Sequence, residues 1–285
     1  MLATRTIWNR LYQYISPYRN PDIKDRVSQY CIETANGLGT YAFGTDPQAF
    51  EIALHLAWFL YRKYFRVQVH GWEHLCKGPL LVASNHSGHL PFDAMMINTG
   101  FFLEAPHPVV LHGMVDRHVA RLPFISTLFT RLGHMVGTRR VCRQLLQSGA
   151  SVLVFPEGVA GISKPFSQRY QLQNFGHGFV KLAMQTGVPV LPIALVGAEE
   201  QAISVANIKP LAKLLHLPYF PLILPQLCVP IPLPVRYTLY IGKPLDFGSK
   251  NLSPSEKTVV RGVARVKNSI RALIARGLRN RQTVF

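Results

Sequence analysis

Short apolar runs alternate with helical stretches from residue 66 onward, and this alternation constrains the fold more than any other feature. The helical stretches cover residues 92–103, 120–131, 139–148 and 175–186. The apolar runs are FRVQVHG (65–71), PLLVASN (79–85), HPVVLHG (107–113), SVLVFP (151–156) and VPVLPIALVG (188–197). Such alternation predicts one α/β domain over residues 66–250, with a mixed or mostly parallel central sheet flanked by helices. Active-site loops are expected at the carboxyl ends of the strands.

A helical, membrane-associating region is predicted for residues 1–65, ahead of this domain. Pro47 follows a capping Asp46 and starts a helix of about 18 residues, because proline suits the first helical position. Its apolar run is shorter than the roughly 20 residues that span a bilayer. One side of the helix carries Phe50, Leu54, Trp58 and Tyr61. This helix is expected either to lie in the membrane interface or to pack on the domain core.

The segment 251–285 is predicted to form a basic amphipathic helix. Ser253 and Glu256 have capping-box spacing, and the segment carries eight Lys or Arg residues against one acid. Apolar residues recur at helical spacing at Val259, Val263, Val266 and Ile270. Such a helix suits an anionic membrane, and the alternative is an ordinary packing helix with a solvated charged face.

Residues 208–236 form a long, mostly uncharged stretch that contains many prolines. Because proline disrupts a regular helix, this stretch is not expected to span a membrane. It is expected to wall an acyl-chain tunnel or dip into lipid, or else to be a plain buried connection.

The chain has a formal net charge of +17, with 48% hydrophobic residues and a mean hydropathy of +0.13. The charge predicts an anionic partner, and the apolar content favours a lipid surface over nucleic acid. The four cysteines are scattered, and the N-terminal residues lack the pattern of a secretory signal. We therefore expect a peripheral protein on the cytoplasmic face of a membrane, with no nucleic-acid partner.

The segment VASNHSGHLPFDAMMI contains the residues that point to chemistry. His86 follows a predicted strand, and Asp93 lies near the start of the next helix. A histidine held by a carboxylate can act as a general base, and no G-x-S-x-G elbow accompanies the pair. The acceptor hydroxyl is therefore expected to attack the acyl group directly. Backbone N–H groups around Ser87 and Gly88 are candidate donors to the oxyanion.

Two alternatives use the same segment. His89 lies four positions before Asp93, so a His89–Asp93 pair is an alternative base. His86, His89 and Asp93 also form a candidate metal site, although the Asn, Gly and Pro of the segment fit a turn that shapes a dyad better. We expect no metal.

NHSGHLPFD resembles the first signature of the glycerolipid acyltransferase family, of the lysophosphatidic acid acyltransferase type. Three later blocks resemble the other signatures in order: GHMVGTRR (133–140), FPEG (155–158) and GVPVLPIALVG (187–197). The four blocks together span about residues 68–200. Six residues separate His86 from Asp93 where the family usually has four, and this longer form resembles a subgroup closer to diacylglycerol and monoacylglycerol acyltransferases.

The resemblance implies a function and a role for each matching residue. It implies transfer of a fatty acyl group from acyl-CoA or an acyl-carrier protein, with no other cofactor, to a hydroxyl of a glycerolipid such as lysophosphatidate. The alternatives are a mono- or diacylglycerol acceptor and a catalytically silent lipid-binding or lipid-transfer module. The implied roles are His86 as the base, Asp93 as its partner, Arg139 as a phosphate contact, and Glu157, Gly158 and Asn85 as substrate-binding residues.

Overall fold

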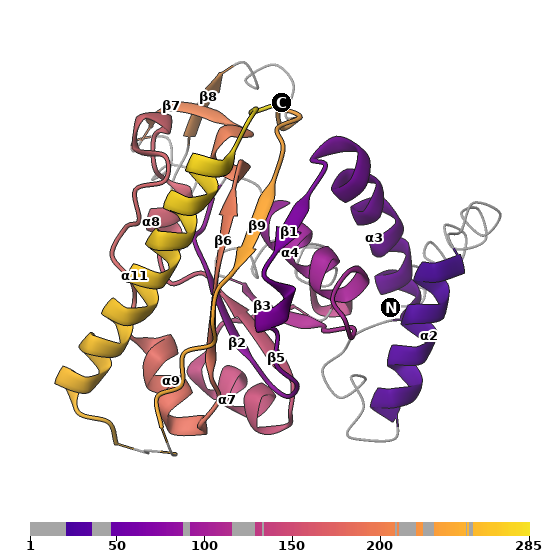
Figure 1. Ribbon diagram of the computed structural model, residues 1–285, viewed down its shortest axis with the longest axis vertical. Helices are drawn as coiled ribbons and strands as arrows, with labels where there is room; N and C mark the ends of the chain where they lie inside the picture. Colours follow the sequence, from indigo (N-terminus) through magenta and orange to yellow (C-terminus); the bar gives the residue numbers. More distant parts are fainter. Residues whose placement is uncertain are drawn as a thin grey trace.

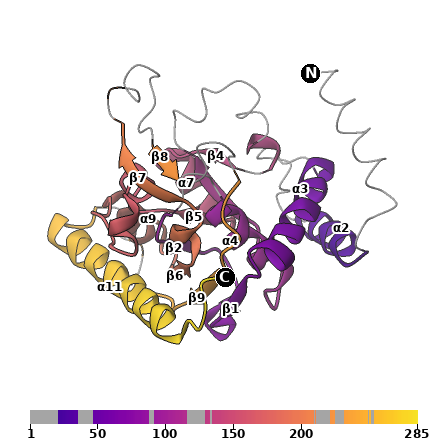
Figure 2. The ribbon, with the colours of Figure 1, turned by 90° about the horizontal axis from the view of Figure 1, so that it is seen from above.

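The computed structural model describes residues 21–35, 47–87, 92–115, 129–132, 134–208, 210, 221–224, 231–248, 250 and 253–285. These residues build a central seven-stranded sheet with helices on both faces (Figures 1 and 2). Its strands lie in the order β1 (Gln68–His70), β9 (Thr238–Ile241), β6 (Val190–Val196), β2 (Leu81–Ser84), β5 (Ser151–Val154), β3 (Leu111–Val115) and β4 (Met135–Val136). The five strands from β6 to β4 are mutually parallel, whereas β9 pairs antiparallel with β6. The predicted mixed, mostly parallel sheet is confirmed.

Helices cover both faces of this sheet. On one face α7 (Arg139–Gln147), α9 (Gly178–Thr186) and α11 (Glu256–Asn280) pack over β2, β5 and β6. On the other face α4 (Phe92–Leu103) packs its Met96, Ile97 and Phe101 into a second core. The helices predicted at 92–103, 139–148 and 175–186 are therefore confirmed, but most of the one predicted at 120–131 lies outside the described residues.

The C-terminal helix α11 lies along the sheet face, as the yellow ribbon of Figure 1 shows. Its cap is Ser255, whose hydroxyl accepts the Thr258 amide, so the predicted capping box at Ser253 is wrong by two positions. Most of its apolar residues face the protein, and the buried ones include Val259, Val263, Val266, Ile270 and Ile274.

The N-terminal helices α2 (Pro21–Ala35) and α3 (Pro47–Phe59) lie side by side at the opposite flank (Figures 1 and 2). The predicted helix is confirmed as α3 followed by one wider turn, η3 (Leu60–Tyr64). Leu54 of α3 packs in a small core with Phe102 of α4, whereas Leu56 and Phe59 are 61% and 57% exposed.

A two-stranded antiparallel sheet, β7 (Ile203–Asn207) with β8 (Pro221–Leu224), follows β6. The strand β8 lies within the stretch 208–236. Most of this stretch lies outside the described residues, so the predicted wall of an acyl-chain tunnel stays a prediction. None of the helices in the described ranges is long and apolar enough to cross a bilayer.

Candidate active site

His86 and Asp93 lie together at the carboxyl end of β2. The Nδ1 atom of His86 is 2.6 Å from Oδ2 of Asp93, which sits in the first turn of α4. The Asp93 carboxylate is fully buried, and it also accepts the amides of Ser87 (3.0 Å) and Ala94 (2.7 Å). Because a carboxylate only accepts, Nδ1 of His86 carries the hydrogen, and Nε2 is left with its lone pair.

The backbone and ring of His86 are fixed by the segment after β5. Its amide donates to Oε1 of Glu157 at 3.0 Å, and its ring stacks on Phe155 with 4.0 Å between centroids. Gly161, in the short helix α8 (Val159–Ile162), completes this wall: a Cβ there would lie 2.9 Å from Cβ of both His86 and Glu157. Only glycine lets α8 approach the histidine this closely.

Glu157 is buried, and both of its carboxylate oxygens accept hydrogen bonds. Its Oε1 accepts the His86 amide, its Oε2 accepts the Gln173 amide at 2.7 Å, and Nζ of Lys164 lies 3.6 Å away. Glu157 therefore holds the backbone of His86 in place. Its implied role in contacting the acceptor stays a prediction.

Asn85 and Gly158 shape the two turns beside the dyad. Both side-chain amide atoms of the buried Asn85 bond the backbone of Leu195, at 3.0 and 2.9 Å, and so tie the end of β2 to β6. Gly158 adopts φ 55° and ψ −143°, a conformation open essentially to glycine alone. Substrate binding by these two residues stays a prediction.

Arg139 is the exposed first residue of α7, and it does not touch the dyad. Its Nε lies 3.8 Å from where a Cβ on Gly178, the first residue of α9, would be. The N-terminal ends of α7 and α9 therefore lie close to one guanidinium. Helix N-termini carry partial positive charge, so this corner favours an anion.

His89 and Gly88 lie outside the described residues, so the alternative His89–Asp93 pair and the Gly88 donor stay predictions. The Ser87 amide is engaged by Asp93, which makes its predicted role as an oxyanion donor wrong. Within the described ranges, no three His, Cys, Asp or Glu side chains are grouped as a metal site would require.

A buried charge network next to the dyad was missed by sequence reasoning. Lys164 pairs with Glu199 at 3.1 Å as well as with Glu157, and Glu199 also accepts the Tyr170 amide. Glu200 accepts the hydroxyl of Tyr170 at 2.9 Å and pairs with Arg281, just past the end of α11. Burial raises the pKa of the Glu199 carboxyl, and Lys164 opposes that shift. A signal in the sequence is the pair of acids, Glu199 and Glu200, that begins three residues after the buried strand β6 ends.

Comparison with known proteins places this site in a family. The Acyltransferase family model matches residues 66–196. An uncharacterized protein of Mycobacterium tuberculosis is 35% identical over 254 residues, which cover 85% of this chain and 70% of that protein. A Gallus gallus protein named "DGAT1/2-independent enzyme synthesizing storage lipids" is 26% identical, over 75% of this chain and 61% of its own.

A solved structure shares the fold. The crystal structure of the 1-acyl-sn-glycerophosphate acyltransferase PlsC from Thermotoga maritima aligns with a TM-score of 0.54 and 18% identity, over 99% of this chain and 100% of that one. The family match covers all five predicted strands and each of the residues to which the sequence assigned a role. The chain belongs to the glycerolipid acyltransferase family.

Proposed function

We propose that this chain transfers a fatty acyl group from a thioester, acyl-CoA or an acyl-carrier protein, to the hydroxyl of a lysophospholipid, of which lysophosphatidate is the simplest. The observation that carries the proposal is the 2.6 Å contact between Nδ1 of His86 and the buried Asp93. The His86 side chain keeps 19% of its surface exposed, so its free Nε2 is on a residue that substrate can reach.

The reaction follows from this geometry. Nε2 takes the proton of the acceptor hydroxyl as the oxygen attacks the thioester carbonyl carbon. The C–S bond then breaks, and the leaving thiolate takes the proton from the imidazolium. Asp93 stabilises the imidazolium between these steps, and a base positioned in this way contributes about 10²- to 10⁴-fold in rate. No further cofactor is needed.

The acceptor phosphate is proposed to bind at Arg139. This residue offers a guanidinium beside the N-terminal ends of α7 and α9, and both helix dipoles attract a phosphate there. The positive charge of an arginine at a helix N-terminus is repelled by the positive end of the helix dipole. A bound phosphate attracts both and so offsets this repulsion.

The chain is also proposed to bind the cytoplasmic face of an anionic membrane as a peripheral protein. Leu56 and Phe59 of α3 point to solvent, and the chain has a net charge of +17. Exposed apolar side chains together with positive charge are the combination that holds proteins at anionic lipid surfaces.

A non-phosphate acceptor such as mono- or diacylglycerol is the second candidate. The name of the Gallus gallus relative, which refers to storage lipids, favours it. The catalytic step is the same for both acceptors, so only the binding of the acceptor head distinguishes them.

The test is thiol release from palmitoyl-CoA and from a palmitoyl carrier protein, with lysophosphatidate, monoacylglycerol or diacylglycerol as acceptor. His86→Ala is expected to lower kcat by about 10³-fold, because it removes the general base. His89→Ala is the matched control and is expected to retain activity. Loss with His89→Ala alone would instead assign the base to His89. Lipid binding without release from either carrier would favour a silent lipid-binding module.

A further inference from the structure

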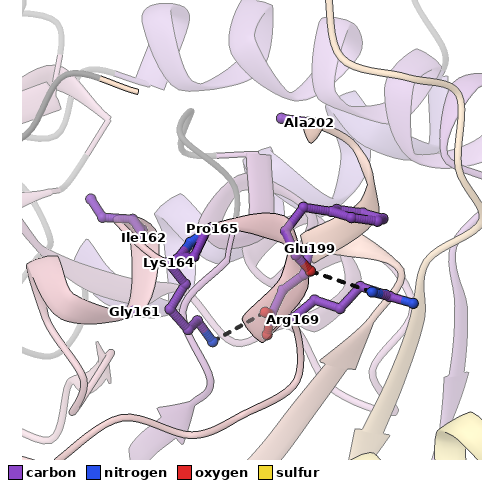
Figure 3. A pocket seen from close by; sticks show the side chains of 8 residues that line it. Gly161, Ile162, Lys164, Pro165, Arg169, Glu199 and Ala202 are labelled. Atoms are coloured by element: carbon purple, nitrogen blue, oxygen red, sulfur yellow. Dashed lines mark hydrogen bonds and ion pairs between the residues drawn. The ribbon is translucent and has the colours of Figure 1, made fainter. Parts of the chain in front are cut away.

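Lys164 lies among buried carboxylates behind the dyad, and the proposed reaction gives it no role. Its Nζ atom is 3.1 Å from Oε2 of Glu199 and 3.6 Å from Oε2 of Glu157, and it donates to the carbonyl of Gln171 at 3.3 Å. Figure 3 shows the ion pair between Lys164 and Glu199 as a dashed line. Only 3% of the lysine side chain is exposed, so its charge acts on these neighbours and not on a substrate.

Glu157 links this lysine to the general base. Its Oε1 accepts the amide of His86, and its Oε2 accepts the amide of Gln173 and faces Nζ of Lys164. An ionised carboxylate binds backbone amides more strongly than a neutral group does. By favouring the ionised form of Glu157, the charge of Lys164 strengthens the bond that fixes the His86 backbone.

Glu199 holds the lysine from the other side, and a strained residue supports it. Its Oε2 also accepts the amide of Tyr170 at 2.8 Å. Tyr170 has a φ of 64°, which a bulky residue seldom adopts, and its hydroxyl donates to Glu200 and accepts the amide of Gly197. Such a conformation persists only where the surroundings hold it, and here it directs an amide at the carboxylate that holds Lys164.

Two buried carboxylates meet at this lysine. The Oε2 atoms of Glu157 and Glu199 both lie within 3.6 Å of its Nζ, and both residues are buried. Burial raises the pKa of the Glu199 carboxyl, whereas the charge of Lys164 lowers it. Without this cation the two carboxylates repel each other or share a proton, and in both cases the oxygens of Glu157 leave their places. The amide of His86 then loses its fixed acceptor.

We propose that Lys164 is a positioning residue for the dyad: its charge holds Glu157 in place, and Glu157 in turn holds the backbone of His86 so that the ring meets Asp93. Lys164 acts through Glu157 and touches neither the reacting atoms nor the substrate. This inference rests on the proposed acyltransferase function, since it explains how the general base of that reaction is kept in place.

The first test measures kcat and KM of the full chain, with the acyl donor and acceptor that the wild type uses fastest. Lys164→Met keeps an apolar stem of similar length and removes the charge. It is expected to lower kcat about 100-fold and to leave both KM values within about twofold, because misplacing a catalytic group by about 1 Å has an effect of this size on the reacting step. Glu199→Gln is the matched control. It removes the other partner of the lysine but leaves Lys164 on Glu157, and it is expected to lower kcat only about threefold.

The double variant Lys164→Met with Glu199→Gln is expected to regain about tenfold in kcat over Lys164→Met, because Glu157 no longer faces a second carboxylate. A residue that contacted the substrate would not be rescued in this way. The inference is overturned if Lys164→Met raises the KM of the acceptor with kcat unchanged, if its kcat stays within threefold of the wild type, or if the double variant regains nothing.

NMR of isotope-labelled histidine rings measures the placement of His86 without turnover. The ring nitrogens of His86, identified by their absence from His86→Ala, report whether Nδ1 keeps its hydrogen toward Asp93. Lys164→Met is expected to shift these signals, whereas Glu199→Gln leaves them near their wild-type positions. A loss of folded protein alone gives weaker signals at the wild-type positions, and that result overturns the inference.

The same measurement separates this inference from the proposed function. If no acceptor supports acyl transfer but Lys164→Met shifts the His86 signals, the acyltransferase proposal fails and the positioning assignment stands. If the wild type transfers acyl groups but Lys164→Met leaves both kcat and the signals unchanged, only the positioning assignment fails. Should Lys164→Met not fold, the double variant is compared with Glu199→Gln alone: a further loss of about threefold in kcat is expected, and equal values refute the assignment.

Discussion

Two helices with apolar stripes, α3 and α11, flank the sheet on opposite sides and meet different surroundings. The apolar side of α11 is buried against β6, β9 and α9, and its basic side faces water together with Val260 and Leu278. The helix α3 buries Leu54 and Ala57 but leaves Leu56 and Phe59 exposed. Apolar residues at helical spacing therefore indicate that one side of a helix is shielded from water. They do not indicate whether protein or lipid shields it.

The sheet explains the burial of α11. All seven residues of β6 are buried, so both faces of this strand need a covering layer. Gly262 and Gly277 let α11 lie close, since a Cβ at Gly277 would be 2.7 Å from side-chain atoms of Val196 and Tyr240. The alternative that treated α11 as a packing helix thus accounts for its apolar side.

The largest expected effect is on stability, from truncating a core residue of α11. Ile270 is fully buried, and Ile270→Ala is expected to lower the free energy of unfolding by about 3 kcal/mol, since it removes packed atoms and leaves a cavity. Val260→Ala, at a position 45% exposed on the same helix, is the control and is expected to cost less than about 1 kcal/mol. Urea denaturation measures both, and equal losses would show that α11 does not cover the core as described.

Local sequence patterns were enough to predict much of the fold. The bounds of α4 match the prediction residue for residue, because the acid of its first turn and its apolar residues lie within it. The strand β9 was missed: it is only four residues long, and its place between β1 and β6 depends on contacts with residues over 40 positions away. The cap of α11 was misplaced because only Ser253 has a glutamate three positions later, as the capping box requires, whereas the observed cap, Ser255, has Thr258 at that position.

In the candidate site, too, contacts between residues close in sequence were predicted and contacts between distant residues were not. His86 and Asp93 lie seven positions apart, and a strand–turn–helix brings them together, so the sequence predicted their meeting. The Lys164–Glu199 and Glu200–Arg281 pairs join residues 35 and 81 positions apart. Sequence spacing alone does not indicate such long-range pairs, and each charge taken singly resembles a solvated surface residue.

The second prediction tests whether α3 is the lipid-facing member of the two helices. Leu56→Glu with Phe59→Glu is expected to weaken binding to anionic vesicles about 100-fold, because each apolar side chain contributes roughly 1.5 kcal/mol or more on entering lipid. The free energy of unfolding should change little, since both side chains are exposed. Vesicle co-sedimentation measures the binding.

The matched control for this pair is Val260→Glu, an exposed apolar position on α11. It is expected to weaken vesicle binding less than threefold. If Val260 faces water and does not enter lipid, replacing it removes no contact with the membrane. Equal losses from the α3 pair and from Val260→Glu would mean that both helices enter lipid, and the contrast between them would not hold.

The smallest expected effect comes from the basic side of α11. Lys257, Arg261 and Arg279 are exposed, and replacing all three with Gln is expected to weaken binding to anionic vesicles about threefold at low salt. Charges on a side that does not enter lipid attract the vesicle only through long-range electrostatics, which salt screens. The loss of binding should therefore vanish at about 0.5 M salt, where the screening length is a few ångströms. The α3 pair should instead lose binding at every salt concentration. A loss from the α11 triple variant that exceeds that of the α3 pair would make α11 the principal membrane contact and reverse the comparison.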